Sequence, residues 1–188
     1  MLKSRIMTLS FYKRNLPHWQ PECCSIFVTW RLYDSLPKGF SEHLRKWSDE
    51  PGKQFLNAER LLDAASSGPR WLNDPEIACT TRRAIERGAE LGHYDLRAYV
   101  IMPNHVHVLL DPLTPLDKLT KGIKGVSARN ANTKLGRVGN PFWQDESFDH
   151  WIRSPGEFAS VQTYIESNPV KARLCANPQD WHWSSAHK

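Results

Sequence analysis

The feature that most constrains the fold is the segment YDLRAYVIMPNHVHVLLDP at residues 94–112. Two apolar runs, rich in β-branched and aromatic residues, flank the tripeptide Met102-Pro103-Asn104. Such runs, separated by a short proline-containing break, are typical of two strands joined by a tight turn. The segment therefore predicts a β-hairpin near the centre of the chain, and with it an antiparallel sheet.

The sequence around this hairpin predicts one further strand on each side and several helices. Residues 23–32 (CCSIFVTWRL) form an aromatic, β-branched run, and residues 148–153 (FDHWIR) alternate weakly. The predicted fold class is α+β, a small antiparallel sheet with helices packed on it. Helical spacing of apolar residues and start signals such as Ser154-Pro155-Gly156-Glu157 place helices at residues 40–47, 56–65, 75–92, 116–135 and 154–167, the last one stopped by Asn168-Pro169.

Length and charge indicate one domain with a polyanionic partner. The chain has 188 residues, 25 of them basic and 20 acidic, which gives a formal net charge of +5. One domain of this size buries a sufficient core. We predict a basic N-terminal arm at residues 1–22, a single domain at residues 23–175 and a polar, aromatic tail at residues 176–188.

Membrane and secretory classes are not favoured. Residues 98–110 lack charge, but they are shorter than the roughly 20 residues of a membrane span and contain two histidines. The first 19 residues have no sustained apolar stretch of the kind that a secretory signal needs. The four cysteines form no C-x-x-C pair and are interpreted as reduced thiols. We therefore expect a cytoplasmic protein.

The first candidate for chemistry is His105-Val106-His107. Side chains alternate along a strand, so both imidazoles point to the same face and can share one metal ion. The alternative is that one histidine is a surface residue and the other belongs to a hydrogen-bond network.

The second candidate is the pair Tyr164 and Asn168, which lie four residues apart and so share one face of the last predicted helix. An amide oxygen is a hard ligand suited to Mg²⁺ or Mn²⁺. A tyrosine hydroxyl beside such an ion can attack phosphorus and form a covalent phosphotyrosine. The alternative is a packing tyrosine and an asparagine that ends the helix before proline.

Three segments together resemble the REP-associated tyrosine transposases, single-tyrosine members of the His-hydrophobic-His nuclease superfamily. They are VIMPNHVHVLL, FWQDESFDHWIR and YIESNPVKARL, and the opening RNLPHW and the strand FVTWRL fit the same group. The likeness covers residues 14–183. One departure is Arg173, where many relatives carry glycine, and we expect a changed loop there.

The resemblance implies a fold, a chemistry and a substrate. The sheet would be ferredoxin-like or RNA-recognition-like, with the catalytic tyrosine on a C-terminal helix. His105, His107 and Asn168 would hold a divalent metal, Mg²⁺ or Mn²⁺, and Tyr164 would become joined to a 5′ phosphate. The partner would be single-stranded DNA at the foot of a REP hairpin in the bacterial nucleoid, bound by a monomer or a homodimer.

Basic and aromatic residues are candidate DNA contacts. In the helix predicted at residues 116–135, an apolar stripe of Leu116, Leu119, Ile123 and Val126 leaves the basic side chains mostly off it. Trp181 and Trp183 could equally cap the core. The candidate DNA contacts are Lys13, Arg14, Lys118, Lys121, Lys124, Arg129, Arg153, Lys171, Trp181 and Trp183.

Two other functions remain open from the sequence. The first is a structured DNA- or RNA-hairpin binder whose catalytic centre is silent. The second is a zinc protein that uses His105, His107 and a cysteine, although no H-E-x-x-H or paired C-x-x-C pattern supports it. Asp149 is a further candidate carboxylate near the metal, although a solvated acidic residue is the more common outcome.

Overall fold

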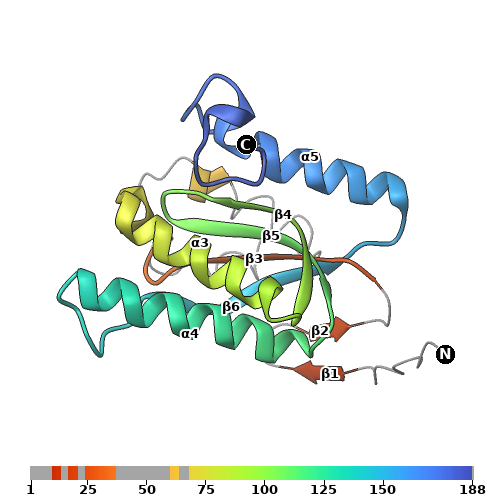
Figure 1. Cartoon of the computed structure of the whole chain (residues 1–188), viewed down its shortest axis with the longest axis horizontal. Coiled ribbons are helices and arrows are strands. Elements are labelled where there is room, and N and C mark those ends of the chain that lie inside the picture. The colour runs from red at the N-terminus through yellow and green to blue at the C-terminus, as the bar shows by residue number, and fades with distance from the viewer. Residues whose placement is uncertain (1–9, 14–16, 21–23, 37–59, 64–67, 188) are drawn as a thin grey trace.

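The computed structural model describes residues 10–13, 17–20, 24–36, 60–63 and 68–187 (Figure 1). Most predicted elements are present. The helix predicted at residues 40–47 lies outside the described residues, and of the one at residues 56–65 only residues 60–63 are described, and they are helical. The elements are β1 (Ser10–Lys13), β2 (Pro17–Gln20), β3 (Ile26–Leu32), α3 (Pro75–Glu90), β4 (Tyr94–Ile101), β5 (His105–Pro112), α4 (Leu116–Lys134), β6 (Trp143–Trp151) and α5 (Pro155–Lys171), with short 3-10 turns at Trp71–Asn73 and Pro178–Asp180.

The central sheet has four strands in the order β4-β5-β3-β6, and every neighbouring pair is antiparallel. The predicted hairpin is confirmed as β4 and β5, and the turn between them is closed by a hydrogen bond from the Met102 N–H to the His105 carbonyl (2.9 Å). Strand β3 lies between β5 and β6 and pairs with both. This topology places the centre of β5 beside the centre of β3, where both strands are buried.

Helices cover the two faces of the sheet separately (Figure 1). The larger core contains α3 and α4 packed on alternate residues of β3 and β5, such as Val28, Trp30 and Val106. The smaller core contains α5 packed on the opposite face, against Phe27, Val100 and Leu109. Alternation along each strand explains this division, because successive side chains point to opposite faces. The predicted α+β class is confirmed.

Local capping fixes the start of two helices. Asp74 accepts a hydrogen bond from the Glu76 N–H (2.8 Å) at the start of α3, and Ser154 accepts one from the Glu157 N–H (3.2 Å) at the start of α5. Each helix has a proline at its first position, where the missing N–H has no partner to lose. The predicted start of α5 is therefore confirmed.

The predicted end of α5 is wrong, because the helix continues through Pro169 to Lys171. Proline in the last turn removes one backbone donor, but the later donors still bond. The N–H of Ala172 donates to the Asn168 carbonyl (2.9 Å), and that of Leu174 donates to the Pro169 carbonyl (2.8 Å). Arg173 closes the turn with a φ of 58°, the left-handed region that favours glycine.

Two other expectations need correction, the burial of Val126 and the start of the last strand. Val126 is 54% exposed and does not belong to the buried stripe of α4, which continues instead through Ser127 and Ala131, four residues apart. The N-terminal arm contains backbone pairing, because β1 and β2 form a two-stranded antiparallel sheet. Strand β6 begins at Trp143, five residues before the predicted strand.

The C-terminal tail lies along the free edge of β4. The Ile101 N–H donates to the Trp183 carbonyl (2.8 Å), and the Ser185 N–H donates to the Tyr99 carbonyl (2.9 Å). Val100 and Ser184 form an antiparallel bridge between these two bonds. The tail therefore protects this edge of the sheet as a short additional strand would. Among the described residues, no helix is both long enough and apolar enough to cross a membrane.

Candidate functional site

The two histidines of β5 lie side by side in the smaller core. Both are fully buried, and their ring centroids are 4.7 Å apart. Their Nε2 atoms face each other at 3.1 Å. The strand periodicity predicts this common face, because one residue separates them.

The other ring nitrogen of each histidine contacts an oxygen atom. Asn104 donates from Nδ2 to the Leu62 carbonyl (3.0 Å), so its Oδ1 faces the His105 Nδ1 (2.7 Å) and accepts the proton there. The His107 Nδ1 contacts the Thr29 hydroxyl at 2.7 Å. A proton on Nδ1 leaves the lone pair of an imidazole on Nε2, and in that tautomer the two facing atoms are both suited to bind a cation.

Asn168 brings an amide from α5 to the same place. The side chain is fully buried, and its Nδ2 lies 3.4 Å from the His107 Nε2. Its Oδ1 is buried and has no hydrogen-bond partner among the described residues. A buried carbonyl oxygen without a partner costs about 1–3 kcal/mol. Half a rotation of the amide exchanges its two ends and directs this oxygen toward the imidazoles, so the residue fits a hard cation.

Tyr164, one helical turn before Asn168, packs edge-on against His107. Its ring centroid lies 5.6 Å from that of His107 and 6.0 Å from that of Phe27. Phe27 in turn stacks on His107 at 5.5 Å. Lys171, the last residue of α5, places its ammonium 4.6 Å from the centre of the Tyr164 ring. The structure thus brings together all four predicted catalytic and metal residues.

Two charged residues near the histidines were not singled out by the sequence. Asp63, in the helical residues 60–63, has its Oδ1 3.8 Å from the His105 Nε2. Arg31 on β3 is directly opposite His105 in the sheet and donates to the Ser35 hydroxyl (3.3 Å). Burial lowers the pKa of the Arg31 guanidinium, and Asp34 partly offsets this effect. Only long-range pairing brings these residues together.

Asp149, the carboxylate considered from the sequence, lies on the wrong face for a role in this site. It pairs with Val28, whose side chain belongs to the larger core, whereas its neighbour His150 pairs with Phe27 on the histidine face. His150 contacts Glu157 on α5 at 2.8 Å. No group of three or more His, Cys, Asp or Glu side chains within the described part of the chain forms a metal cluster. A cation here would therefore depend on the amide of Asn168.

Comparison with known proteins decides the family. The family model described as "Transposase IS200 like" matches residues 70–168, which is 99 of the 188 residues. The match includes both histidines, Tyr164 and Asn168. The chain belongs to the IS200-like transposase family. No curated protein matches the sequence of the chain.

One solved structure confirms the transposase fold. This chain aligns with the structure of a REP-associated tyrosine transposase bound to a REP hairpin, with a TM-score of 0.59 and 18% sequence identity. The alignment covers 95% of this chain and 83% of the chain of the relative. A protein from Deinococcus radiodurans R1 assigned as a transposase also matches at 18% identity, over 84% of this chain and 96% of its own. Its TM-score of 0.38 adds nothing to the assignment.

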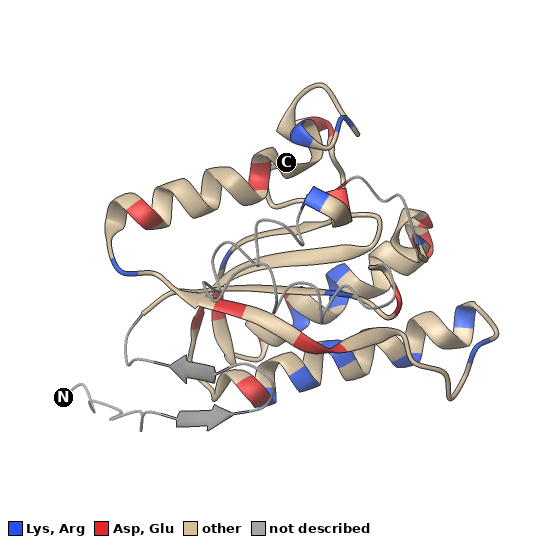
Figure 2. Cartoon of the chain, turned by 180° about the vertical axis from the view of Figure 1, so that it is seen from behind, with Lys and Arg blue, Asp and Glu red and all other residues tan. Residues whose placement is uncertain are grey.

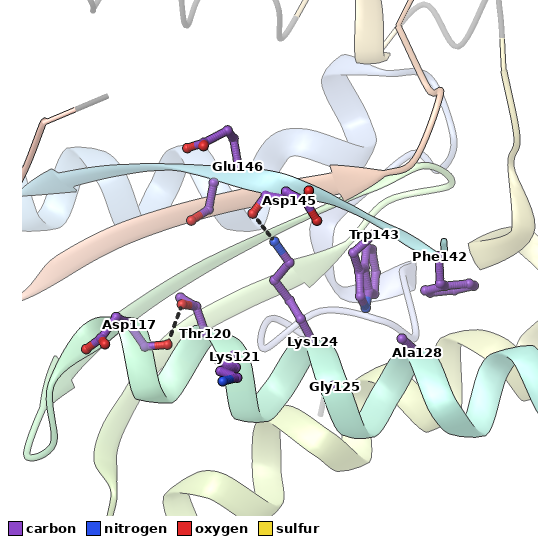
Figure 3. Close-up of a pocket in the computed structure, with 11 residues that line it drawn as sticks. Asp117, Thr120, Lys121, Lys124, Gly125, Ala128, Phe142, Trp143, Asp145 and Glu146 are labelled. Carbon is purple, nitrogen blue, oxygen red and sulfur yellow. Dashed lines mark hydrogen bonds between the residues drawn. The ribbon is translucent and has the colours of Figure 1, made fainter. Parts of the chain in front are cut away.

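The candidate DNA contacts on α4 lie on the face of the transposase sheet that is opposite to the histidines. Lys118, Lys121 and Arg129 are exposed, and basic residues recur along this helix beside β6 (Figure 2). Lys124 instead reaches β6 and donates to the carbonyls of Gln144 (2.7 Å) and Asp145 (2.8 Å). Of these residues, Lys121, Lys124 and Asp145 line a groove of about 350 Å³ between α4 and β6 (Figure 3).

The remaining candidate contacts are spread over the transposase. Arg153 is exposed beside the start of α5 and stacks over Trp151 at 4.8 Å. Trp181 is half-buried in the smaller core and donates to the Ile101 carbonyl (3.0 Å), and Trp183 packs on the larger core. Both tryptophans thus cap the core, which is the alternative that the sequence left open. Lys13 ends β1, and Arg14 lies outside the described residues.

Proposed function

We propose that this transposase nicks and rejoins single-stranded DNA at the foot of a REP-type hairpin, using a divalent cation and a 5′-phosphotyrosine intermediate. His105, His107 and Asn168 would hold Mg²⁺ or Mn²⁺, and Tyr164 would be the nucleophile. The family assignment and the arrangement of these four side chains support the proposal. The REP hairpin bound in the structure of the relative suggests the substrate class.

One observation carries the metal part of this proposal. Two imidazole Nε2 atoms face each other at 3.1 Å, and both rings have Nδ1 in contact with an oxygen atom. If both rings are neutral with the proton on Nδ1, two lone pairs oppose each other, which is unfavourable without a proton or cation between them. The buried Oδ1 of Asn168 adds a third donor that lacks a partner among the described residues. The amide oxygen is the hard donor that favours Mg²⁺ or Mn²⁺ at this site.

The residues of the chain would then perform the phosphoryl transfer. The bound cation would polarise the scissile phosphate and stabilise the leaving oxygen. The Tyr164 oxygen would form a bond to phosphorus while the bond from phosphorus to the 3′ oxygen breaks. The phenol proton is lost and the released 3′ oxygen gains one, so atoms and charge balance. One phosphodiester replaces another, which conserves the bond for rejoining.

The packing of Tyr164 suits a nucleophile that must stay in place. Contacts with His107 and Phe27 hold the ring, which would limit the motion of the phenol before substrate arrives. Lys171 and Arg31 supply positive charge on the same face of the sheet, where a DNA phosphate would approach. We expect the enzyme to act in the cytoplasm on nucleoid DNA, as a monomer or a homodimer.

A covalent-capture experiment tests the function. A single-stranded REP-type hairpin oligonucleotide is labelled at its 3′ end and incubated with the protein and Mn²⁺, and products are separated on a denaturing gel. We expect the label to migrate with the protein, and the same oligonucleotide labelled at its 5′ end to give a shorter free strand. Both products should disappear in chelator and return when Mg²⁺ or Mn²⁺ is added.

Two variants make the assignment specific. Tyr164→Phe should abolish the covalent product but leave hairpin binding nearly intact, whereas Tyr33→Phe, a change at an exposed tyrosine, should behave as wild type. A covalent product with Tyr164→Phe would show that the nucleophile is wrongly assigned. Tight hairpin binding by the wild type without a nicked product in either ion would favour the silent hairpin binder instead.

A further inference from the structure

Asp63 lies beside the paired histidines, although no pattern in the sequence singles it out. It belongs to the helical residues 60–63, more than 40 positions before His105. Its Oδ1 lies 3.8 Å from the His105 Nε2, the same nitrogen that faces His107. The Asp63 side chain is 27% exposed, but this oxygen is shielded from solvent. The carboxylate therefore points inward, at the place where a cation would bind.

A single asparagine fixes both the carboxylate and the ring that it approaches. The Nδ2 of the fully buried Asn104 donates to the carbonyl of Leu62, the residue before Asp63, and its Oδ1 contacts the Nδ1 of His105. Leu62 is itself 3% exposed, so this turn is anchored in the protein. The position of Asp63 relative to His105 is thus held by one side chain and is not the result of a mobile surface contact.

The three donors of the site carry no negative charge, so the carboxylate of Asp63 could balance the charge of a bound cation. Two imidazoles and one amide are neutral donors, and placing a divalent ion among buried neutral groups has a large desolvation cost. A nearby carboxylate offsets that cost. We propose that Asp63 is a positioning residue that balances the charge of the cation at His105 and His107 through a water ligand of that cation. This inference rests on the metal site of the proposed function.

Metal binding without DNA tests this role apart from activity. Mn²⁺ alone is titrated into the full chain in a calorimeter, with wild type, Asp63→Glu and Asp63→Gln compared. The two variants are matched in size and differ in charge. We expect the glutamate variant to bind Mn²⁺ more tightly than the glutamine variant, which should be weakened roughly tenfold to a hundredfold relative to wild type. Asp145→Asn, a change at an exposed carboxylate across the sheet, should leave Mn²⁺ affinity unchanged.

The outcomes separate this inference from the proposed function. Equal Mn²⁺ affinity in wild type, Asp63→Glu and Asp63→Gln would overturn the role of Asp63 and leave the histidine site in place. A wild type that binds no Mn²⁺ would overturn both. Melting curves without metal check that each variant is folded, and the comparison of glutamate with glutamine holds even if both lose some stability.

Discussion

The ammonium of Lys171 lies 4.6 Å from the centre of the Tyr164 ring, and both residues project from α5 two helical turns apart. A cation over an aromatic face stabilises the pair by about 0.5–1 kcal/mol at exposed sites. In the proposed mechanism it also places a positive charge beside the phenol that must lose its proton to attack phosphorus. If Tyr164 is the nucleophile, Lys171 acts beside it in addition to any role in DNA binding.

Replacement of Lys171 by methionine tests that role. The change keeps an unbranched side chain of similar length and removes the charge, so we expect covalent product to form roughly twofold to fivefold more slowly, as a loss of about 0.5–1 kcal/mol requires. Lys171→Arg should remain close to wild type. The measurement is the single-turnover rate of adduct formation at saturating hairpin, and a rate unchanged in Lys171→Met would limit Lys171 to binding.

Gly88 in α3 should not tolerate a methyl group. A Cβ at this position would lie 2.5 Å from the Tyr94 hydroxyl oxygen, and Tyr94 is buried and bonded to the Ile85 carbonyl. We expect Gly88→Ala to lower the free energy of unfolding by about 1–2 kcal/mol, because overpacking outweighs the better helix propensity of alanine. Gly122→Ala in α4, where nothing lies within 4 Å, should raise it by about 1 kcal/mol. Urea denaturation measures both changes.

Glu157 should make stability depend on pH. Hydrogen bonds from His150 and from the Arg153 N–H hold the pKa of this carboxyl below its usual range. A lowered pKa contributes stability above the usual value near 4.3 and loses it as pH falls through the folded value. Glu157→Gln should therefore reduce the free energy of unfolding at pH 7 by up to about 1 kcal/mol. The difference from wild type should disappear near pH 3, and a constant difference at both pH values would contradict this origin.

Arg173 should be replaceable by glycine with a gain in stability. It occupies the left-handed position after α5, with its N–H donating to the Val170 carbonyl at 3.0 Å. A non-glycine residue there costs about 1–2 kcal/mol, part of which the greater freedom of unfolded glycine cancels. We expect Arg173→Gly to raise the unfolding free energy by about 0.5–1 kcal/mol. Arg173→Ala, which removes the side chain but not the strain, should bring no gain in thermal melting.

The sequence predicted local features well. The central hairpin, the start of α5 and the shared face of His105 and His107 all depend on residues a few positions apart, where turn chemistry and strand alternation decide the outcome. The continuation of α5 through Pro169 was missed, because the residue before proline is usually extended. In this helix the carbonyls of Asn168 and Pro169 still accept backbone hydrogen bonds, so the proline costs little stability.

Features that depend on long-range pairing were not predictable from one sequence. Asp63 and Arg31 reach His105 from distant segments, and neither has a local pattern that distinguishes it from a surface charge. The register of β6 against β3 decides which of Asp149 and His150 lies on the face of the sheet that holds the histidine pair. The exposure of Val126 follows from the angle at which α4 lies on the sheet, which helical spacing alone leaves undetermined.

The strand-like pairing of the tail with β4 determines what happens when proteolysis removes the C-terminus. The outward backbone groups of Tyr99 and Ile101 are occupied by Ser185 and Trp183, and Trp181 closes the end of the smaller core. Proteolytic loss of the last eight residues would leave an unpaired sheet edge close to the layer that holds Tyr164. We expect such a shortened chain to self-associate through that edge before its histidine pair is disturbed.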